Sequence, residues 1–160
     1  MDFQVRKASQ EDMPSVLSLI QQLAVYEREP DAVEVTVEDL ERDGFGENPL
    51  FNCFVAETEG KIIGMALFYF RYSTWKGKTV HLEDLIVNEA YRGHGIGFQI
   101  YKKVMEFADE NNLKRVEWVV LDWNAPAINF YKNTGATIFS EWNTVQFDED
   151  SIHKFLKSNS

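Results

Sequence analysis

A glycine-rich heptapeptide offers the clearest chemistry in the chain. Residues 91–97 read Tyr-Arg-Gly-His-Gly-Ile-Gly, between a strand-like pattern and a helical one. Glycine has no Cβ, so backbone N–H groups can approach a ligand closely. The N-terminus of the following helix adds unpaired N–H donors and a partial positive charge. The stretch therefore predicts an anion cradle, and the usual anion is a phosphate.

Spacing separates this loop from two familiar phosphate-binding loops. A P-loop requires Gly-x-x-x-x-Gly-Lys followed by Ser or Thr, and the chain contains no such stretch. A dinucleotide fingerprint requires Gly-x-Gly-x-x-Gly in the first βαβ unit. Here Gly97 comes one place early, Phe98 occupies the required position, and the loop follows a strand meander. Both alternatives are excluded by spacing and context.

Apolar periodicity predicts the elements that position the loop. Their order predicts an α/β (α+β) fold, with a mixed, mostly antiparallel sheet flanked by helices, in a single domain over residues 1–160. A turn is expected at residues 43–46. Strands are expected at 3–6, 51–57, 61–72, 80–87, 115–121, 137–139 and 144–147, and helices at 10–26, 36–42, 96–112, 125–134 and 151–157.

Composition limits the partners and the compartment. The 160 residues carry a formal net charge of −10, which disfavours nucleic acid and favours a cationic small molecule or a basic partner. Acidity that merely aids solubility is the other interpretation. Cys53 is the only cysteine, so we expect it in the core of a cytoplasmic protein without internal disulfides. No apolar run approaches the ~20 residues of a membrane span, and the histidines and cysteine lack metal-ligand spacing.

The pattern Arg92-x-x-Gly95-x-Gly97 resembles the acetyl-CoA loop of the GNAT acetyltransferase superfamily. This resemblance implies acetyl-CoA as co-substrate, no metal, and a homodimer. It also implies acetyl transfer to a primary amine of a small cationic substrate, such as a polyamine or diamine. Longer ordered stretches resemble the spermidine/spermine (diamine) N-acetyltransferase family: Leu82-Glu83-Asp84, residues 91–97, Trp123-Asn124-x-Pro126-x-Ile128-Asn129-Phe130-Tyr131-Lys132, Gly135-Ala136, Tyr26-Glu27 and residues 43–47.

The resemblance assigns two catalytic residues, Tyr131 as general acid for the departing thiolate and Glu83 beside the amine. From spacing alone, Tyr131 is a core tyrosine on an apolar helix face. Adjacent strand residues such as Glu83 and Asp84 point to opposite faces unless the strand is bent or bulged. Val87 N–H is the expected oxyanion donor. The implied cofactor contacts are Leu85, Ile86, Val87, Arg92, Gly93, His94, Gly95, Ile96, Gly97, Phe98, Asn124, Pro126, Ala127 and Tyr131.

Fewer residues indicate the identity of the amine acceptor than indicate the cofactor. Carboxylates hold ammonium groups through charge-assisted hydrogen bonds. Ser73 stands where the family commonly has an acidic residue after Tyr72, so a lysine-like amino acid or a protein amine is an alternative acceptor. A non-catalytic acyl-CoA-binding module is a further alternative, and His81 is an acid/base candidate. The implied substrate contacts are Tyr26, Glu27, Glu83, Glu117, Trp118, Val119 and Glu141.

Overall fold

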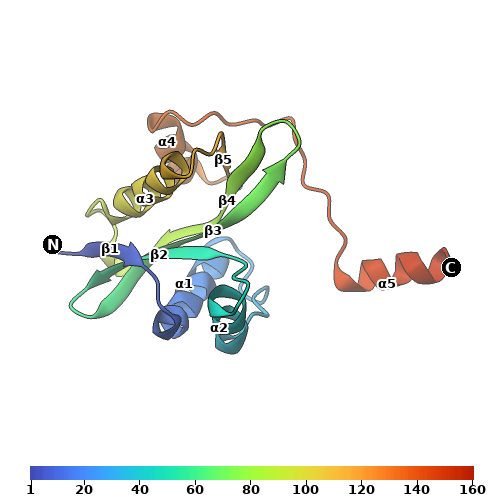
Figure 1. Ribbon diagram of the computed structural model, residues 1–160, viewed down its shortest axis with the longest axis horizontal. Coiled ribbons are helices and arrows are strands. Elements are labelled where there is room, and N and C mark those ends of the chain that lie inside the picture. The colour runs from blue at the N-terminus through green and yellow to red at the C-terminus, as the bar shows by residue number, and fades with distance from the viewer. The chain divides into compact units, whose positions relative to one another are not determined.

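Four antiparallel strands and one short parallel strand form the sheet. The computed structural model describes residues 1–160 and divides into two compact units, Met1–Val119 and Val120–Ser160 (Figure 1). The first unit contains the whole sheet, in the order β1-β2-β3-β4-β5. The first four strands pair antiparallel and β5 pairs parallel with β4, which confirms the mixed, mostly antiparallel sheet. The strands are β1 (Gln4–Lys7), β2 (Asn52–Thr58), β3 (Lys61–Ser73), β4 (Gly77–Val87) and β5 (Val116–Glu117).

Helices cover both faces of this sheet. Figure 1 shows α1 and α2 on one face and α3 on the other. Thr36 caps α2 by accepting a hydrogen bond from the Asp39 N–H, as expected, and α2 continues to Phe45, so the turn predicted at 43–46 is mostly helical. The elements are η1 (Gln10–Asp12), α1 (Met13–Tyr26), α2 (Val37–Phe45), η2 (Glu89–Tyr91) and α3 (Ile96–Glu110). None of the helices is both long and apolar enough to cross a membrane.

The alternation of side chains along β2 and β3 produces a core on each face. Cys53, Val55, Met65 and Leu67 are buried in the cluster that includes Met13, Val16 and Leu19 of α1. The intervening residues belong to the opposite face, where the ring of Phe68 packs 5.4 Å from that of Phe54 and 5.0 Å from that of Phe107 of α3. Burying one such side chain stabilises a fold by about 1.5–3 kcal/mol. The central strands β2 and β3 are therefore packed on both faces, and β4 pairs along β3.

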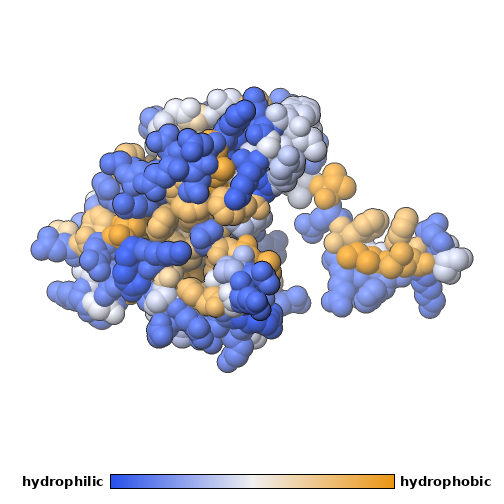
Figure 2. All heavy atoms as spheres, in the orientation of Figure 1, coloured by the Kyte–Doolittle hydropathy of each residue, from blue (hydrophilic) through white to orange (hydrophobic).

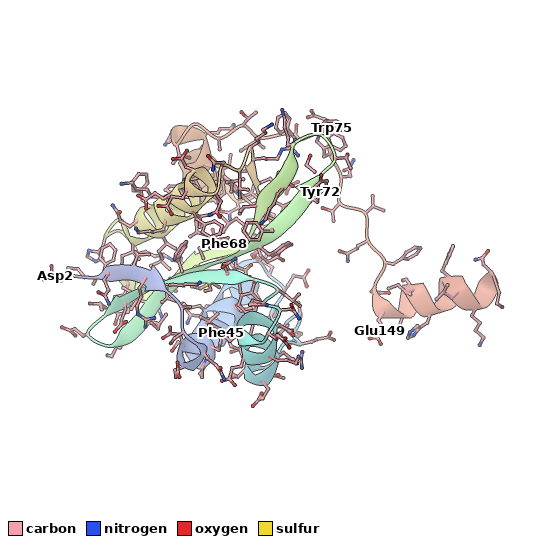
Figure 3. All side chains as sticks on the ribbon, viewed as in Figure 1. Asp2, Phe45, Phe68, Tyr72, Trp75 and Glu149 are labelled. Atoms are coloured by element: carbon pink, nitrogen blue, oxygen red, sulfur yellow. The ribbon has the colours of Figure 1, made fainter.

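The β3–β4 hairpin leaves part of β4 without a neighbour. The hairpin turns through Ser73, whose hydroxyl accepts the N–H groups of Trp75 and Lys76 (Figure 3, where Tyr72 and Trp75 mark the tip). On its other side β4 pairs with β5 only at Val80 and His81. The strand predicted at 115–121 is wrong beyond Glu117, because strand propensity needs a partner strand to bond. The edge of β4 after His81 consequently has no strand beside it.

The second unit contains two helices. Asn124 caps α4 (Ala125–Asn133) through its Oδ1, which accepts a hydrogen bond from Ala127 N–H at 3.4 Å. Helix α5 (Glu149–Ser158) places Ile152, Phe155 and Leu156 at helical spacing, and Figure 2 shows apolar residues gathered along one side of it. The strands predicted at 137–139 and 144–147 are wrong: this stretch contains neither strand nor helix. Its β-branched and aromatic residues find no ladder partner here.

Candidate active site

A β-bulge in β4 determines where its carboxylates point. Asp84 pairs with Leu67 and Leu82 pairs with Phe68, so Glu83 is an extra residue on β4 without a partner on β3. A bulge breaks the strict alternation of a strand and redirects a side chain. From the sequence, Glu83 and Asp84 could face the same site only if the strand were bent or bulged. The structure has such a bulge.

Three carboxylates lie close together at this bulge. Burial first, and then the charges of Glu83 and Glu27, raise the pKa of Asp84 to about 6. Burial and the charge of Glu83 likewise raise the pKa of Glu27. Like charges raise one another's pKa only when they are near. We call Glu27, Glu83 and Asp84 the carboxylate cluster; it is a local concentration of negative charge suited to an ammonium group.

Two further side chains contact Glu83. Tyr69 Oη donates a hydrogen bond to Glu83 Oε2 at 2.9 Å, and His81 Nε2 lies 3.5 Å from the same oxygen. Burial, the hydrogen bond to Glu83 and its charge raise the pKa of Tyr69 to about 12. The phenol therefore keeps its proton and acts as a donor to the carboxylate.

The open edge of β4 presents backbone groups next to the cluster. The N–H of Asn88 donates to the carbonyl of Ile63 at 2.8 Å, so Asn88 faces β3. The carbonyl of Val87 accepts instead from Arg92 Nε at 3.0 Å. In an antiparallel pair, the N–H and C=O of one residue point to the same side and successive residues alternate. The N–H groups of Val87 and Leu85 consequently point to the open edge, where an extended ligand can add to the sheet.

The glycine loop lies against the end of this edge. Gly93 and Gly95 have φ angles of 83° and 75°, and a Cβ at either would meet no atom within 4 Å. A Cβ at Gly97 would lie 3.6 Å from Val87 Cγ2, which brings the start of α3 to the end of β4. The first intrahelical hydrogen bond runs from Gln99 N–H to Gly95 C=O, so the first turn of α3 has donors to spare. This backbone fits the phosphates of a nucleotide cofactor.

Arg92 connects the glycine loop to the end of β4 and the end of α1. Besides its hydrogen bond to Val87, the Arg92 guanidinium lies 5.7 Å from the centre of the Tyr26 ring at the end of α1. Tyr26 and Glu27 therefore lie in the same region as the glycine loop and the carboxylate cluster. Most of the first-unit residues predicted for both ligands are brought together by β4 and its neighbours.

Glu117 has partners of its own. Its carboxylate lies 2.8 Å from Arg71 Nη1 and 3.9 Å from Arg115 Nη1, which joins β5 to the hairpin. The neighbouring Trp118 packs edge-on to Tyr101 at 5.7 Å between ring centres. These contacts give Glu117 and Trp118 structural roles in addition to the substrate contacts predicted for them, and Val119 ends the unit.

The remaining predicted residues belong to the second unit. Tyr131 lies on α4, with its ring 5.6 Å from that of Phe130, and its carbonyl accepts a hydrogen bond from Thr134 Oγ1 at 2.7 Å. Pro126 and Ala127 form the first turn of α4 beside the Asn124 cap. Glu141 lies in the stretch between α4 and α5.

Two features of the site were missed from the sequence. Tyr69 was not singled out, although counting the hairpin register from Gly77 places it opposite His81. The sequence predicts no role for Asp84, because its place in the carboxylate cluster depends on the bulge, and a bulge leaves no signal in a single sequence. Cys53, by contrast, is buried as expected, and burial raises the pKa of its thiol to about 12, so it is no nucleophile. No cluster of three or more metal-ligating side chains is present.

Comparison with known proteins places the chain in a family. The Acetyltransferase (GNAT) family matches residues 13–136. The thialysine N-epsilon-acetyltransferase of Sus scrofa is 40% identical over 161 residues, covering 94% of this chain and 95% of that protein. The spermidine/spermine N(1)-acetyltransferase-like protein 1 of Homo sapiens is 39% identical over 160 residues, covering 94% of this chain and 23% of that protein.

The fold agrees with this result. An integron cassette protein from the mobile metagenome of V. cholerae superposes with a TM-score of 0.80 at 23% identity, covering 98% of this chain and 99% of that one. The family uses acetyl-CoA as co-substrate, and the open β4 edge and glycine loop fit its extended arm and phosphates. The chain belongs to the GNAT acetyltransferase family, within its diamine acetyltransferase group, and is an acetyl-CoA-dependent N-acetyltransferase of amines.

Proposed function

We propose that this enzyme acetylates a primary amine of a small, cationic acceptor, either a lysine-like amino acid or a diamine or polyamine. The carboxylate cluster at the β4 bulge is the observation that carries the proposal. Three carboxylates beside an open strand edge favour a ligand with a positive charge, and charge-assisted hydrogen bonds to ammonium are among the stronger ones. The pig relative is named for thialysine and the human relative for spermidine/spermine, which supports both acceptor classes.

Acetyl-CoA supplies the activated acetyl group, and the residues of this chain bind it and move protons. The N–H groups of residues 93–98 and of Leu85 and Val87 are suited to its phosphates and pantetheine arm, with Val87 N–H as oxyanion donor. Asn124, Pro126 and Ala127 are further proposed contacts, by resemblance. The two units, both partly covered by the family match, are proposed to form one domain over residues 1–160.

The reaction is a direct attack in a ternary complex. Glu83 takes a proton from the ammonium, directly or through a water, and the neutral nitrogen attacks the acetyl carbon. The nitrogen–carbon bond forms to give a tetrahedral intermediate whose oxyanion accepts from Val87 N–H. As the carbon–sulfur bond then breaks, Tyr131 protonates the sulfur, and the second proton lost by the nitrogen restores the Tyr131 hydroxyl through solvent. The proton taken by Glu83 is released, so one proton per turnover goes to solvent. Positioned acid–base groups of this kind contribute about 10²–10⁴-fold each. The homodimer, the cytoplasmic location, and the lack of nucleic-acid or membrane partners stay predictions.

A panel of amines tests the acceptor. Purified enzyme is mixed with acetyl-CoA and thialysine, lysine, putrescine, spermidine or a lysine-containing peptide, and thiol release is followed. We expect kcat/KM for one of the small amines to exceed that for the peptide by about tenfold or more, because the bulge concentrates three carboxylates over a small area. A preference for the peptide would favour a protein acceptor instead. Stabilisation by acetyl-CoA without thiol release for any amine would indicate a non-catalytic module.

A further inference from the structure

Tyr69 and His81 form a pair beneath the carboxylate of Glu83. They are direct cross-strand partners on β3 and β4, and their rings lie 5.3 Å apart with an interplanar angle of 34°. Both present a polar atom to one oxygen of Glu83: Tyr69 Oη at 2.9 Å and His81 Nε2 at 3.5 Å from Oε2. Neither of these contacts involves Oε1, so the two oxygens of the carboxylate have different surroundings.

Glu83 needs such support because of its place on the bulge. Its backbone has no partner on β3, and its side chain is 50% exposed. A free glutamate side chain loses rotamer freedom when it is fixed, which costs free energy. Contacts that fix it before the acceptor binds spare that cost during the reaction. The surroundings of Glu83 Oε2 are therefore of direct value to catalysis.

The burial of His81 identifies which of its nitrogens carries the proton. The side chain is only 13% exposed, and Nδ1 is buried without a hydrogen-bond partner. A proton on Nδ1 would be a buried N–H without an acceptor, which carries a desolvation penalty. A proton on Nε2 avoids this penalty, and Nε2 is the ring nitrogen that lies 3.5 Å from Glu83 Oε2. The distance of 3.5 Å is long, as such contacts often are before ligands bind.

We propose that Tyr69 and His81 are positioning residues that hold Glu83 by Oε2 and so aim Oε1 at the acceptor ammonium. The inference rests on the proposed function, in which Glu83 takes the proton of the amine. It gives His81 a positioning role, in place of the acid/base role considered from the sequence. Tyr69 donates a hydrogen bond to Oε2, and His81 Nε2 lies 3.5 Å from the same oxygen.

Substitutions at His81 separate positioning from packing. His81→Phe keeps a flat ring against Tyr69 and removes the donor, whereas His81→Gln places an amide N–H near the position of Nε2. We expect H81F to lower kcat/KM for the acceptor about tenfold, because Glu83 Oε2 loses one of its two polar contacts. The KM for acetyl-CoA should be unchanged, and H81Q should recover most of the loss. Tyr69→Phe should behave like H81F, and His153→Phe on α5 is the matched control.

A double-mutant cycle with Glu83→Gln decides the mechanism. If His81 acts through Glu83, adding H81F to E83Q should reduce kcat/KM by less than about twofold. A full tenfold loss in the E83Q background, or H81Q as impaired as H81F, would overturn the inference. An impaired E83Q beside fully active H81F and Y69F would overturn it while leaving the proposed function intact. Wild-type turnover by E83Q would overturn both. Thermal melts of each variant confirm folding, and Y69F provides an independent arm if H81F does not fold.

Discussion

Replacing Tyr131 with phenylalanine is expected to lower kcat for acetyl transfer about 100-fold or more. The substitution removes a single hydroxyl from α4 and keeps the ring that packs edge-on against Phe130. In the proposed mechanism this hydroxyl gives its proton to the departing thiolate sulfur. General acids contribute roughly 10²–10⁴-fold to rates. Steady-state thiol release at saturating acetyl-CoA and amine measures the effect.

Binding should survive this substitution. Acetyl-CoA should still stabilise the Tyr131→Phe variant against thermal unfolding, since the glycine loop is untouched and the variant loses only the hydroxyl among the expected cofactor contacts. Tyr72→Phe, at the tip of the β3–β4 hairpin, removes a hydroxyl from a tyrosine that is 76% exposed and serves as the matched control. Turnover by Tyr131→Phe within about threefold of the control would show that another group protonates the sulfur.

Replacing Glu83 with glutamine should lower kcat/KM for the acceptor about 100-fold. The amide preserves the shape of the side chain and can still accept from Tyr69, but it removes the charge and the base. An alkylammonium has a pKa near 10, so little of it is neutral at pH 7 unless the enzyme takes its proton. Initial rates at low amine concentration and saturating acetyl-CoA measure the loss.

The control for this prediction lies a few residues further along the chain. Glu89→Gln removes the same charge from η2, outside the carboxylate cluster, and should leave kcat/KM within about twofold of wild type. If Glu83→Gln instead raised the KM for acetyl-CoA and left the amine unaffected, Glu83 would belong to the cofactor site. Raising the assay pH should partly rescue Glu83→Gln, because more of the amine is then neutral.

Elements with a strong apolar period could be predicted from the sequence. Helix α3 has buried residues at helical spacing, and β3 has an unbroken buried run at residues 63–68. Gly95 precedes α3, Gly60 precedes β3, and Gly77 begins β4. The strands expected at 137–139 and 144–147 had suitable residue types, but pairing is a non-local property that residue types do not determine. The same limit applies beyond Glu117, where β5 ends after two residues.

The candidate site likewise has parts that could be predicted from the sequence and parts that could not. The glycine loop follows from its spacing, since glycines and a helix start suffice to specify it. The role of the backbone at the end of β4 came only from the family resemblance, because residue types do not specify it. The side-chain parts depend on register. One extra residue at Glu83 brings Asp84 into the carboxylate cluster and sets Glu83 beside Tyr69. For Glu117 the residue type suggested a contact with the amine, but in the structure its carboxylate pairs with Arg71.

The raised pKa of Asp84 links acceptor binding to proton release. Its value of about 6 lies above the 3.8 of an unburied aspartate, owing first to burial and then to Glu83 and Glu27. The stability that this group contributes is full below pH ~4 and is lost as pH rises through about 6.

A bound cation favours the ionised carboxylate, so an acceptor that binds near pH 6 should expel a proton and bind more tightly as pH rises. Calorimetry in buffers of different ionisation enthalpy measures that proton directly; equal heats in all buffers at pH 6 would contradict it. In the proposed function, the folding stability that Asp84 gives up at neutral pH is restored when the cationic acceptor binds beside it.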